Sequence, residues 1–224
     1  MKKLVFITFI FFPLLAMSQT LEFGPTLGLH ASSIDDANFF IDKPSIGKRL
    51  WNVNKGFQTI LYFKDPKQTS TGAITLNFHN TDYGVRSDKR QNFYSYNTNS
   101  FDIGYRFSGF PDYEKNIRAY LEAGLGINLF DTSNYYHGLT EETDAFPELK
   151  EAIALKDKEL KLVLGLGFDF NVFKDFICFT ELKASGGFTN ITQNDGAYID
   201  TYFQLNTGLR YIVNFKKKES KIEE

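Results

Sequence analysis

The side chains best suited to chemistry in this chain are two histidines, His30 and His79. Ser32 and Ser33 closely follow His30, and Asp82 closely follows His79. An imidazole beside a hydroxyl or a carboxylate can act as a general base. No GxSxG, HExxH, CxxC or phosphate-loop pattern accompanies them, so the simpler interpretation is hydrogen-bonded polar residues.

Two groups of acidic residues have the ligand chemistry that suits a hard cation such as calcium. They are Asp35 and Asp36 in one place, and Glu141, Glu142 and Asp144 in the other. Neither group has the spacing of an EF-hand loop, so we interpret them as solvated loop acids. We therefore predict no catalytic residue, no metal site and no cofactor.

A more regular set of charged residues falls on one face of several extended segments. Its acids are Glu22, Asp102, Glu122, Asp169 and Glu181, and its bases are Arg106, Arg118, Lys161, Lys183 and Arg210, with Lys64 as a further candidate. The two signs nearly balance, and charges kept from bulk water need partners. We predict a salt-bridged plug inside the fold, with a conducting lining as the alternative.

The elements that position these charges are clearest in residues 202–215, where two kinds of side chain alternate. One set is Phe203, Leu205, Thr207, Leu209, Tyr211, Val213 and Phe215. The other is Tyr202, Gln204, Asn206, Gly208, Arg210, Ile212 and Asn214. Successive side chains of a strand point to opposite faces. The segment exceeds the about 9–11 residues that a tilted strand needs to cross a bilayer.

Similar alternation predicts eight strands. They cover residues 21–31, 56–64, 73–79, 97–107, 117–129, 160–172, 176–185 and 202–215. The links at 32–55, 80–96, 131–158 and 186–200 are long, whereas those at 65–72, 109–116 and 173–175 are short. An even strand number with alternating link lengths predicts an all-β, eight-stranded antiparallel transmembrane β-barrel. It would be an up-and-down meander with short periplasmic turns and long extracellular loops.

Alternation alone leaves open which face is inside, because a soluble barrel would put its apolar face inwards. Glycines such as Gly124, Gly126, Gly165 and Gly167 share the polar face with long charged side chains. Small residues opposite long ones fill the narrow interior of eight strands, whereas a water-facing surface gains nothing from them. The polar face is therefore predicted to line the lumen, and the apolar face to contact outer-membrane lipid.

Aromatic residues make up 17% of the chain, and several of them cluster near one predicted rim. They are Phe23, Phe63, Phe107, Phe170, Phe176, Tyr211 and Phe215. Such residues suit an aromatic girdle at the periplasmic membrane interface. The net charge of −2 and the lack of a basic patch argue against nucleic acid as a partner.

The first 18 residues have the pattern of a cleaved secretory signal. Lys2 and Lys3 precede an apolar run, and Ala16-Met17-Ser18 fits a cleavage site. We predict residues 1–18 as the signal peptide, 19–215 as the barrel and 216–224 as a charged periplasmic tail. Both mature termini would then lie in the periplasm. The single cysteine, Cys178, excludes an intramolecular disulfide.

With these features in place, the chain resembles the PorT-like β-barrels of the Bacteroidota outer membrane. The resemblance is carried by Met1-Lys2-Lys3, Ser18-Gln19, Gly24-Pro25-Thr26-Leu27-Gly28, Leu121-Glu122-Ala123-Gly124-Leu125-Gly126 and Asn206-Thr207-Gly208-Leu209-Arg210-Tyr211. It implies the barrel fold and an outer-membrane location. The family includes components of type IX secretion, but its shared positions are architectural and carry no functional residue to this chain.

These observations lead to the expectation of a non-enzymatic outer-membrane barrel that serves a larger envelope complex as a scaffold or accessory subunit. The sequence leaves open whether this assembly serves secretion, uptake or barrel insertion. A small passive channel is the first alternative. A lipid-modifying enzyme that uses His30 or His79 is the second.

Overall fold

The computed structural model describes residues 20–36, 48–63, 71–87, 92–112, 117–138, 156–189 and 198–215. Eight strands account for nearly all of them: β1 (Thr20–Asp36), β2 (Lys48–Tyr62), β3 (Thr71–Ser87), β4 (Asn92–Asp112), β5 (Ile117–Gly138), β6 (Lys158–Phe173), β7 (Phe176–Gly187) and β8 (Tyr198–Asn214). The predicted signal segment, the tail and Lys64 lie outside the described residues, so those assignments stay predictions.

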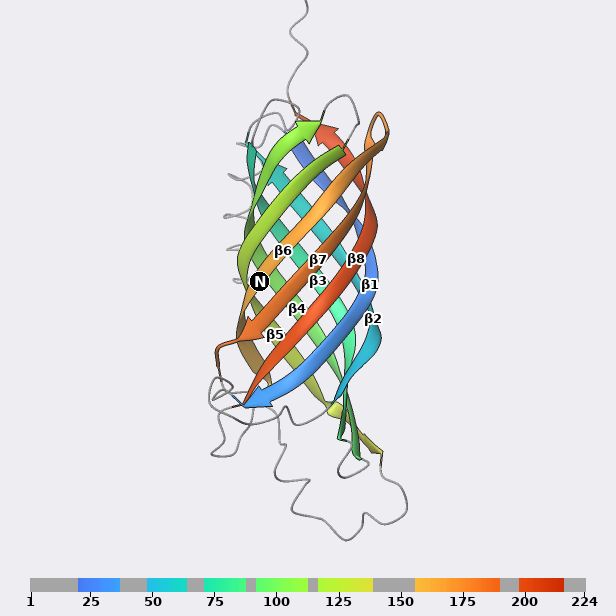
Figure 1. The fold of residues 1–224 in the computed structure, drawn as a ribbon, viewed down its shortest axis with the longest axis vertical. Helices are drawn as coiled ribbons and strands as arrows, with labels where there is room; N and C mark the ends of the chain where they lie inside the picture. Colours follow the sequence, from blue (N-terminus) through green and yellow to red (C-terminus); the bar gives the residue numbers. More distant parts are fainter. Residues whose placement is uncertain are drawn as a thin grey trace, which may run out of the picture.

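Each strand pairs antiparallel with the next along the chain, and β1 pairs with β8, so the sheet closes into a barrel (Figure 1). The predicted up-and-down eight-stranded fold is thereby confirmed. Closure joins Thr20 to Asn214 at one rim, which we call the terminal end; the opposite rim is the distal end. A closed barrel leaves no free strand edge along its wall.

The closing seam contains one interruption. Pairing of β1 with β8 stops at Phe23 and Tyr211 and resumes in the same register at Thr26 and Gly208. Pro25 lies in the gap and has no backbone N–H to donate to the neighbouring strand.

The strands run further toward the distal end than the alternation predicts. The link expected at 80–96 is wrong, because β3 and β4 stay paired to Ser87 and Asn92. β1 likewise continues to Asp36, and β5 continues to Gly138. The distal ends of β3, β4 and β5 project past the rest of the wall, at the lower right of Figure 1. Polar residues there break the two-residue hydrophobic period, while the pairing of β3 with β4 stays continuous. The pairing of β4 with β5 shifts register between Ser95 and Asn97 and then resumes.

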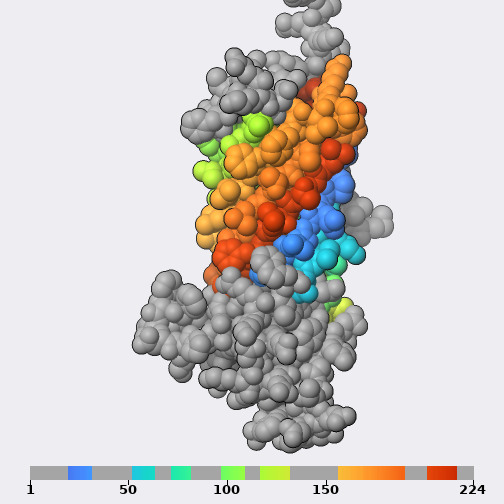
Figure 2. Space-filling model, turned by 45° about the vertical axis from the view of Figure 1, so that its right-hand side comes forward, coloured from blue at the N-terminus to red at the C-terminus, as the bar shows by residue number. Residues whose placement is uncertain are grey.

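Burial along the wall is the inverse of that in a soluble protein. Leu121 is 62% exposed, whereas its neighbour Glu122 is only 4% exposed. On β6, Leu164 is 53% exposed beside a buried Val163. Figure 2 shows the outer surface over β6, β7, β8 and β1, where such apolar side chains point outwards. The described residues include no helix that is long and apolar enough to span a membrane.

Candidate functional site: the ion-paired barrel interior

The structure places all ten charged residues singled out from the sequence on the inner wall. Nine of them are at most 5% exposed, and the side chain of Arg118 is 12% exposed. They come from β1, β4, β5, β6, β7 and β8, and strand alternation turns each of them inwards. The narrow interior then brings residues from distant parts of the chain into contact.

Four of these residues form the central ring, in which bases and acids alternate. Arg106 contacts Glu122 at 2.9 Å and Glu181 at 3.1 Å. Lys183 contacts the same two acids, at 3.1 Å for Glu122 and 3.4 Å for Glu181. Each charge therefore has two neighbours of opposite sign, which offsets the cost of its burial.

Four others form the terminal ring, which has the same alternation. Arg118 contacts Glu22 at 3.0 Å and Asp169 at 2.6 Å. Arg210 contacts Glu22 at 3.3 Å and is also paired with Asp169. Arg106 lies 4.0 Å from Asp169, so the two rings form one continuous network.

The remaining two predicted residues, Lys161 and Asp102, pair with each other at 2.8 Å. The Lys161 ammonium also donates to Ser100 at 3.0 Å and to the Tyr202 hydroxyl at 2.5 Å. Sequence reasoning missed Glu159, which is buried nearby and accepts a hydrogen bond from Asn128 at 3.0 Å. Glu159 lies two positions before Lys161, so extending the strand by one residue would have found it.

Neutral side chains that were also missed complete the network. Gln58 accepts a hydrogen bond from Arg210 at 2.6 Å and donates to Asn77 at 2.9 Å. Asn77 in turn donates to Glu122 at 3.0 Å. The Arg106 guanidinium lies 3.6 Å from the centre of the Tyr120 ring, a cation–π contact. These contacts fix the geometry of the charged groups.

Glycines on the inner wall leave space for the long side chains of the network. A Cβ at Gly167 would stand 2.5 Å from the hydroxyl of Tyr120. At Gly126 it would stand 2.5 Å from the Cε of Lys161. The inner wall therefore requires glycine where a long side chain from a neighbouring strand crosses it.

The two histidines are buried in the distal half of the lumen. His30 Nδ1 lies 3.1 Å from the amide nitrogen of Gln204, and the His30 ring lies 4.9 Å from that of Tyr202. His79 is 1% exposed. The side chains of Ser32, Ser33 and Asp82 lie outside the described residues.

A metal site gains no support from the described residues, which contain no group of three or more His, Cys, Asp or Glu arranged to hold an ion. The side chains of Asp35 and Asp36, and the whole of Glu141, Glu142 and Asp144, lie outside the description.

The aromatic residues predicted as a girdle lie near the terminal ends of their strands. Tyr211 is central, with its ring 6.0 Å from Phe23 and 5.2 Å from Phe176. Phe107 and Phe215 are nearly half exposed. Phe63 directly follows β2, and Phe170 lies on β6. Their role at a membrane interface stays a prediction.

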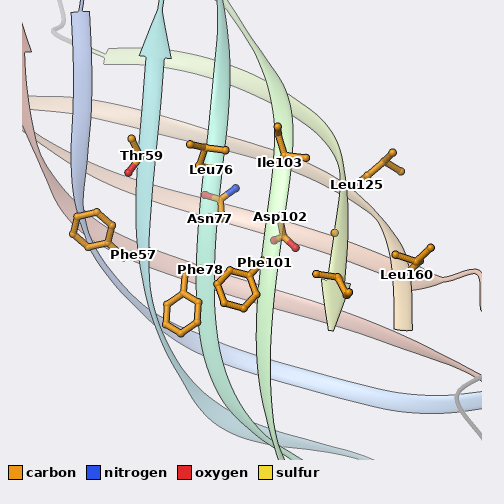
Figure 3. Close-up of a pocket in the computed structure, with 12 residues that line it drawn as sticks. Phe57, Thr59, Leu76, Asn77, Phe78, Phe101, Asp102, Ile103, Leu125 and Leu160 are labelled. Carbon is orange, nitrogen blue, oxygen red and sulfur yellow. The ribbon is translucent and has the colours of Figure 1, made fainter. Parts of the chain in front are cut away.

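The outer wall over β2–β6 carries an apolar groove of about 670 Å³ (Figure 3). The rings of Phe78 and Phe101 lie 4.9 Å apart on its border. Leu76, Ile103 and Leu125 also line it. Apolar side chains therefore point outwards across the middle of the wall.

Comparison with solved structures finds small outer-membrane barrels. OprG from Pseudomonas aeruginosa has a TM-score of 0.53 and 10% sequence identity, covering 88% of this chain and 97% of its own. The chain has the fold of an outer-membrane β-barrel. No known protein family and no curated protein matches it.

Two further barrels are similar at lower scores. The attachment invasion locus protein Ail of Yersinia pestis has a TM-score of 0.41 and 13% identity, covering 85% of this chain and 98% of its own. Neisserial surface protein A has a TM-score of 0.47 and 8% identity, covering 84% of this chain and 96% of its own.

Proposed function

We propose that this protein is an integral, non-enzymatic barrel of the outer membrane that acts as a scaffold or accessory subunit of a larger envelope assembly. Its outward-facing leucine and phenylalanine side chains would contact lipid. Its terminal end would lie in the periplasm, and its distal end would face the outside. Secretion, including type IX secretion, is one candidate assembly, beside uptake and barrel insertion.

The continuous ion-paired network is the observation that carries this proposal. The two rings and the contact between Arg106 and Asp169 join side chains from both halves of the chain across the lumen. Eight strands enclose only enough room for side chains, and moving buried paired charges apart is costly. A protein with such an interior is best suited to act through its surfaces.

The projecting ends of β3, β4 and β5 are the surface best placed to reach a partner. Backbone pairing of β3 with β4 continues out to Arg86 with Phe93. Pairing of β4 with β5 shifts register between Ser95 and Asn97 and resumes out to Phe93 with Gly138. A paired, three-stranded extension is a stiffer platform than an unpaired loop, because its backbone hydrogen bonds are made internally.

The test is an affinity purification of the tagged full chain from gently solubilised native membranes, with bound proteins identified by mass spectrometry. We expect a stoichiometric envelope partner. A variant with residues 84–95 replaced by a tight turn should lose this partner, whereas removal of residues 216–224 should leave it bound. Recovery of the folded barrel alone would contradict the proposal.

Two assays separate the alternatives. Steady conductance of the purified barrel in a planar bilayer would favour a passive channel. Lipid-modifying activity that disappears in both His30→Ala and His79→Ala would favour an enzyme.

A further inference from the structure

One part of the lumen wall carries buried polar atoms that lack a hydrogen-bond partner in the described part of the chain. They are Thr26 Oγ1, Asn54 Oδ1, Thr75 Oγ1, both ring nitrogens of His79, Thr81 Oγ1 and Thr98 Oγ1. We call these six residues the unpaired wall. All of them lie on β1 to β4, and each is at most 5% exposed.

These atoms are grouped in space. Asn54, Thr81 and Thr98 occupy directly paired positions on three successive strands, so their inward side chains share one level of the barrel. At the next level, His79 Nδ1 and Thr26 Oγ1 flank Gly56. They lie 2.6 Å and 2.7 Å from the point where a Cβ on that glycine would stand.

Asn54 Nδ2 donates to Asn206 Oδ1 at 2.8 Å, so only its Oδ1 lacks a partner in that part of the chain. Short side chains explain why the other atoms of this wall are unpaired. Threonine and glycine do not reach across the lumen, whereas the opposite side supplies long residues such as Lys161 and Lys183. Those ammonium groups are already committed, to Asp102 at 2.8 Å and to Glu122 at 3.1 Å. Both ammonium groups therefore bind carboxylates and leave the atoms of the unpaired wall without a partner among the described residues.

Buried polar groups in folded proteins almost always have a hydrogen-bond partner, and buried water supplies it where protein does not. We propose that the unpaired wall binds ordered water, with one site shared by His79 and Thr26 and another by Asn54, Thr81 and Thr98. Water fits because hydroxyl and neutral imidazole groups both donate and accept. An added ion would bring net charge to a region whose neighbouring ion pairs are balanced.

This inference concerns the interior and is independent of the proposed surface role. It adds a hydrated sector, the unpaired wall, to an interior whose ion pairs also include residues of β1 and β4. The central ring borders the hydrated sector, because Asn77 and Gln58 continue the same wall and are fully hydrogen-bonded to that network. The barrel would hold water without passing it.

The experiment is X-ray radiolytic footprinting of the full folded barrel in nanodiscs, read by mass spectrometry. Bound water is split in place, so a buried side chain that touches it is labelled. We expect His79 to be labelled several-fold faster than Phe179, which is equally buried but lies against Arg210. Thr26→Val should slow the labelling of His79, because it removes one hydroxyl of the shared site.

Thr180→Val is the matched control, because Thr180 is partly exposed and its hydroxyl bonds to a backbone carbonyl. It should leave His79 labelling unchanged. The proposal is overturned if wild-type His79 is labelled no faster than Phe179. It is also overturned if a folded Thr26→Val barrel labels His79 at the wild-type rate. The wild-type comparison decides the matter even if Thr26→Val does not fold.

Discussion

Arg106 and Glu122 occupy directly paired positions on β4 and β5, and their side chains meet inside the barrel at 2.9 Å. Arg106→Leu would leave Glu122 and Glu181 each short of one buried partner. Breaking a buried ion pair from one side costs about 3–5 kcal/mol. We expect a loss of that size in the free energy of unfolding, measured by denaturant titration in lipid vesicles.

The matched control for this variant is Arg106→Leu combined with Glu181→Gln. This removes one charge of each sign and leaves the Lys183–Glu122 pair intact. The double variant should be more stable than the sum of the two single changes predicts, by about 0.5–3 kcal/mol. Simple additivity would show that the ring is not energetically coupled.

Leu164→Arg tests which face contacts lipid. Leu164 lies midway along β6 and is 53% exposed on the outer wall. An arginine facing lipid at the bilayer midplane costs about 2–4 kcal/mol, and near the interface about 0–1 kcal/mol. Phe173→Arg, at the terminal end of β6, should therefore cost much less in the same vesicle-unfolding assay. Equal costs would contradict the proposed membrane span.

Gly167→Ala tests the packing of the inner wall. The added methyl group would meet Tyr120, and such overpacking typically costs about 1–3 kcal/mol. Gly186→Ala is the control, because nothing lies within 4 Å of its added Cβ. Thermal unfolding, followed by the mobility shift of unheated samples on gels, should show a lower midpoint only for the change at Gly167.

Tyr211→Ala tests the aromatic contacts near the terminal end. It removes ring contacts with both Phe23 and Phe176, and aromatic pairs contribute about 0.5–1.5 kcal/mol beyond their buried area. Phe173→Ala removes a ring that is 70% exposed and should cost less in vesicle unfolding. If both changes cost the same, ring pairing contributes nothing beyond the contact of each residue with lipid.

The sequence predicted the fold and the inner position of the ten charges because both follow from a period of two residues. It could not predict that Arg118 would meet Glu22, or that Arg210 would meet Asp169. Those pairings depend on how far neighbouring strands are staggered around the barrel, and alternation within one strand carries no information on stagger.

The strand ends were missed for a different reason. Residues 80–96 are mostly polar or charged and include three tyrosines, and there the apolar face disappears while the pairing of β3 with β4 continues. Glu159 was missed because the predicted strand began at residue 160, whereas β6 begins at Lys158. The alternation of apolar and polar side chains marks only the part of a strand that has an apolar face, so it stops before the strand itself ends.

The terminal ring has a consequence for how the chain acquires its fold. Glu22 and Arg210 come from the first and last strands, while Arg118 and Asp169 come from the middle of the chain. No partly assembled sheet can satisfy all four charges, because the partners of Glu22 arrive only when β5 and β8 have both curled around to β1. Closure of the seam is therefore the step that gives Glu22 its partners, whereas the central ring needs only β4, β5 and β7. The terminal ring thereby links the neutralisation of Glu22 to the completion of the barrel.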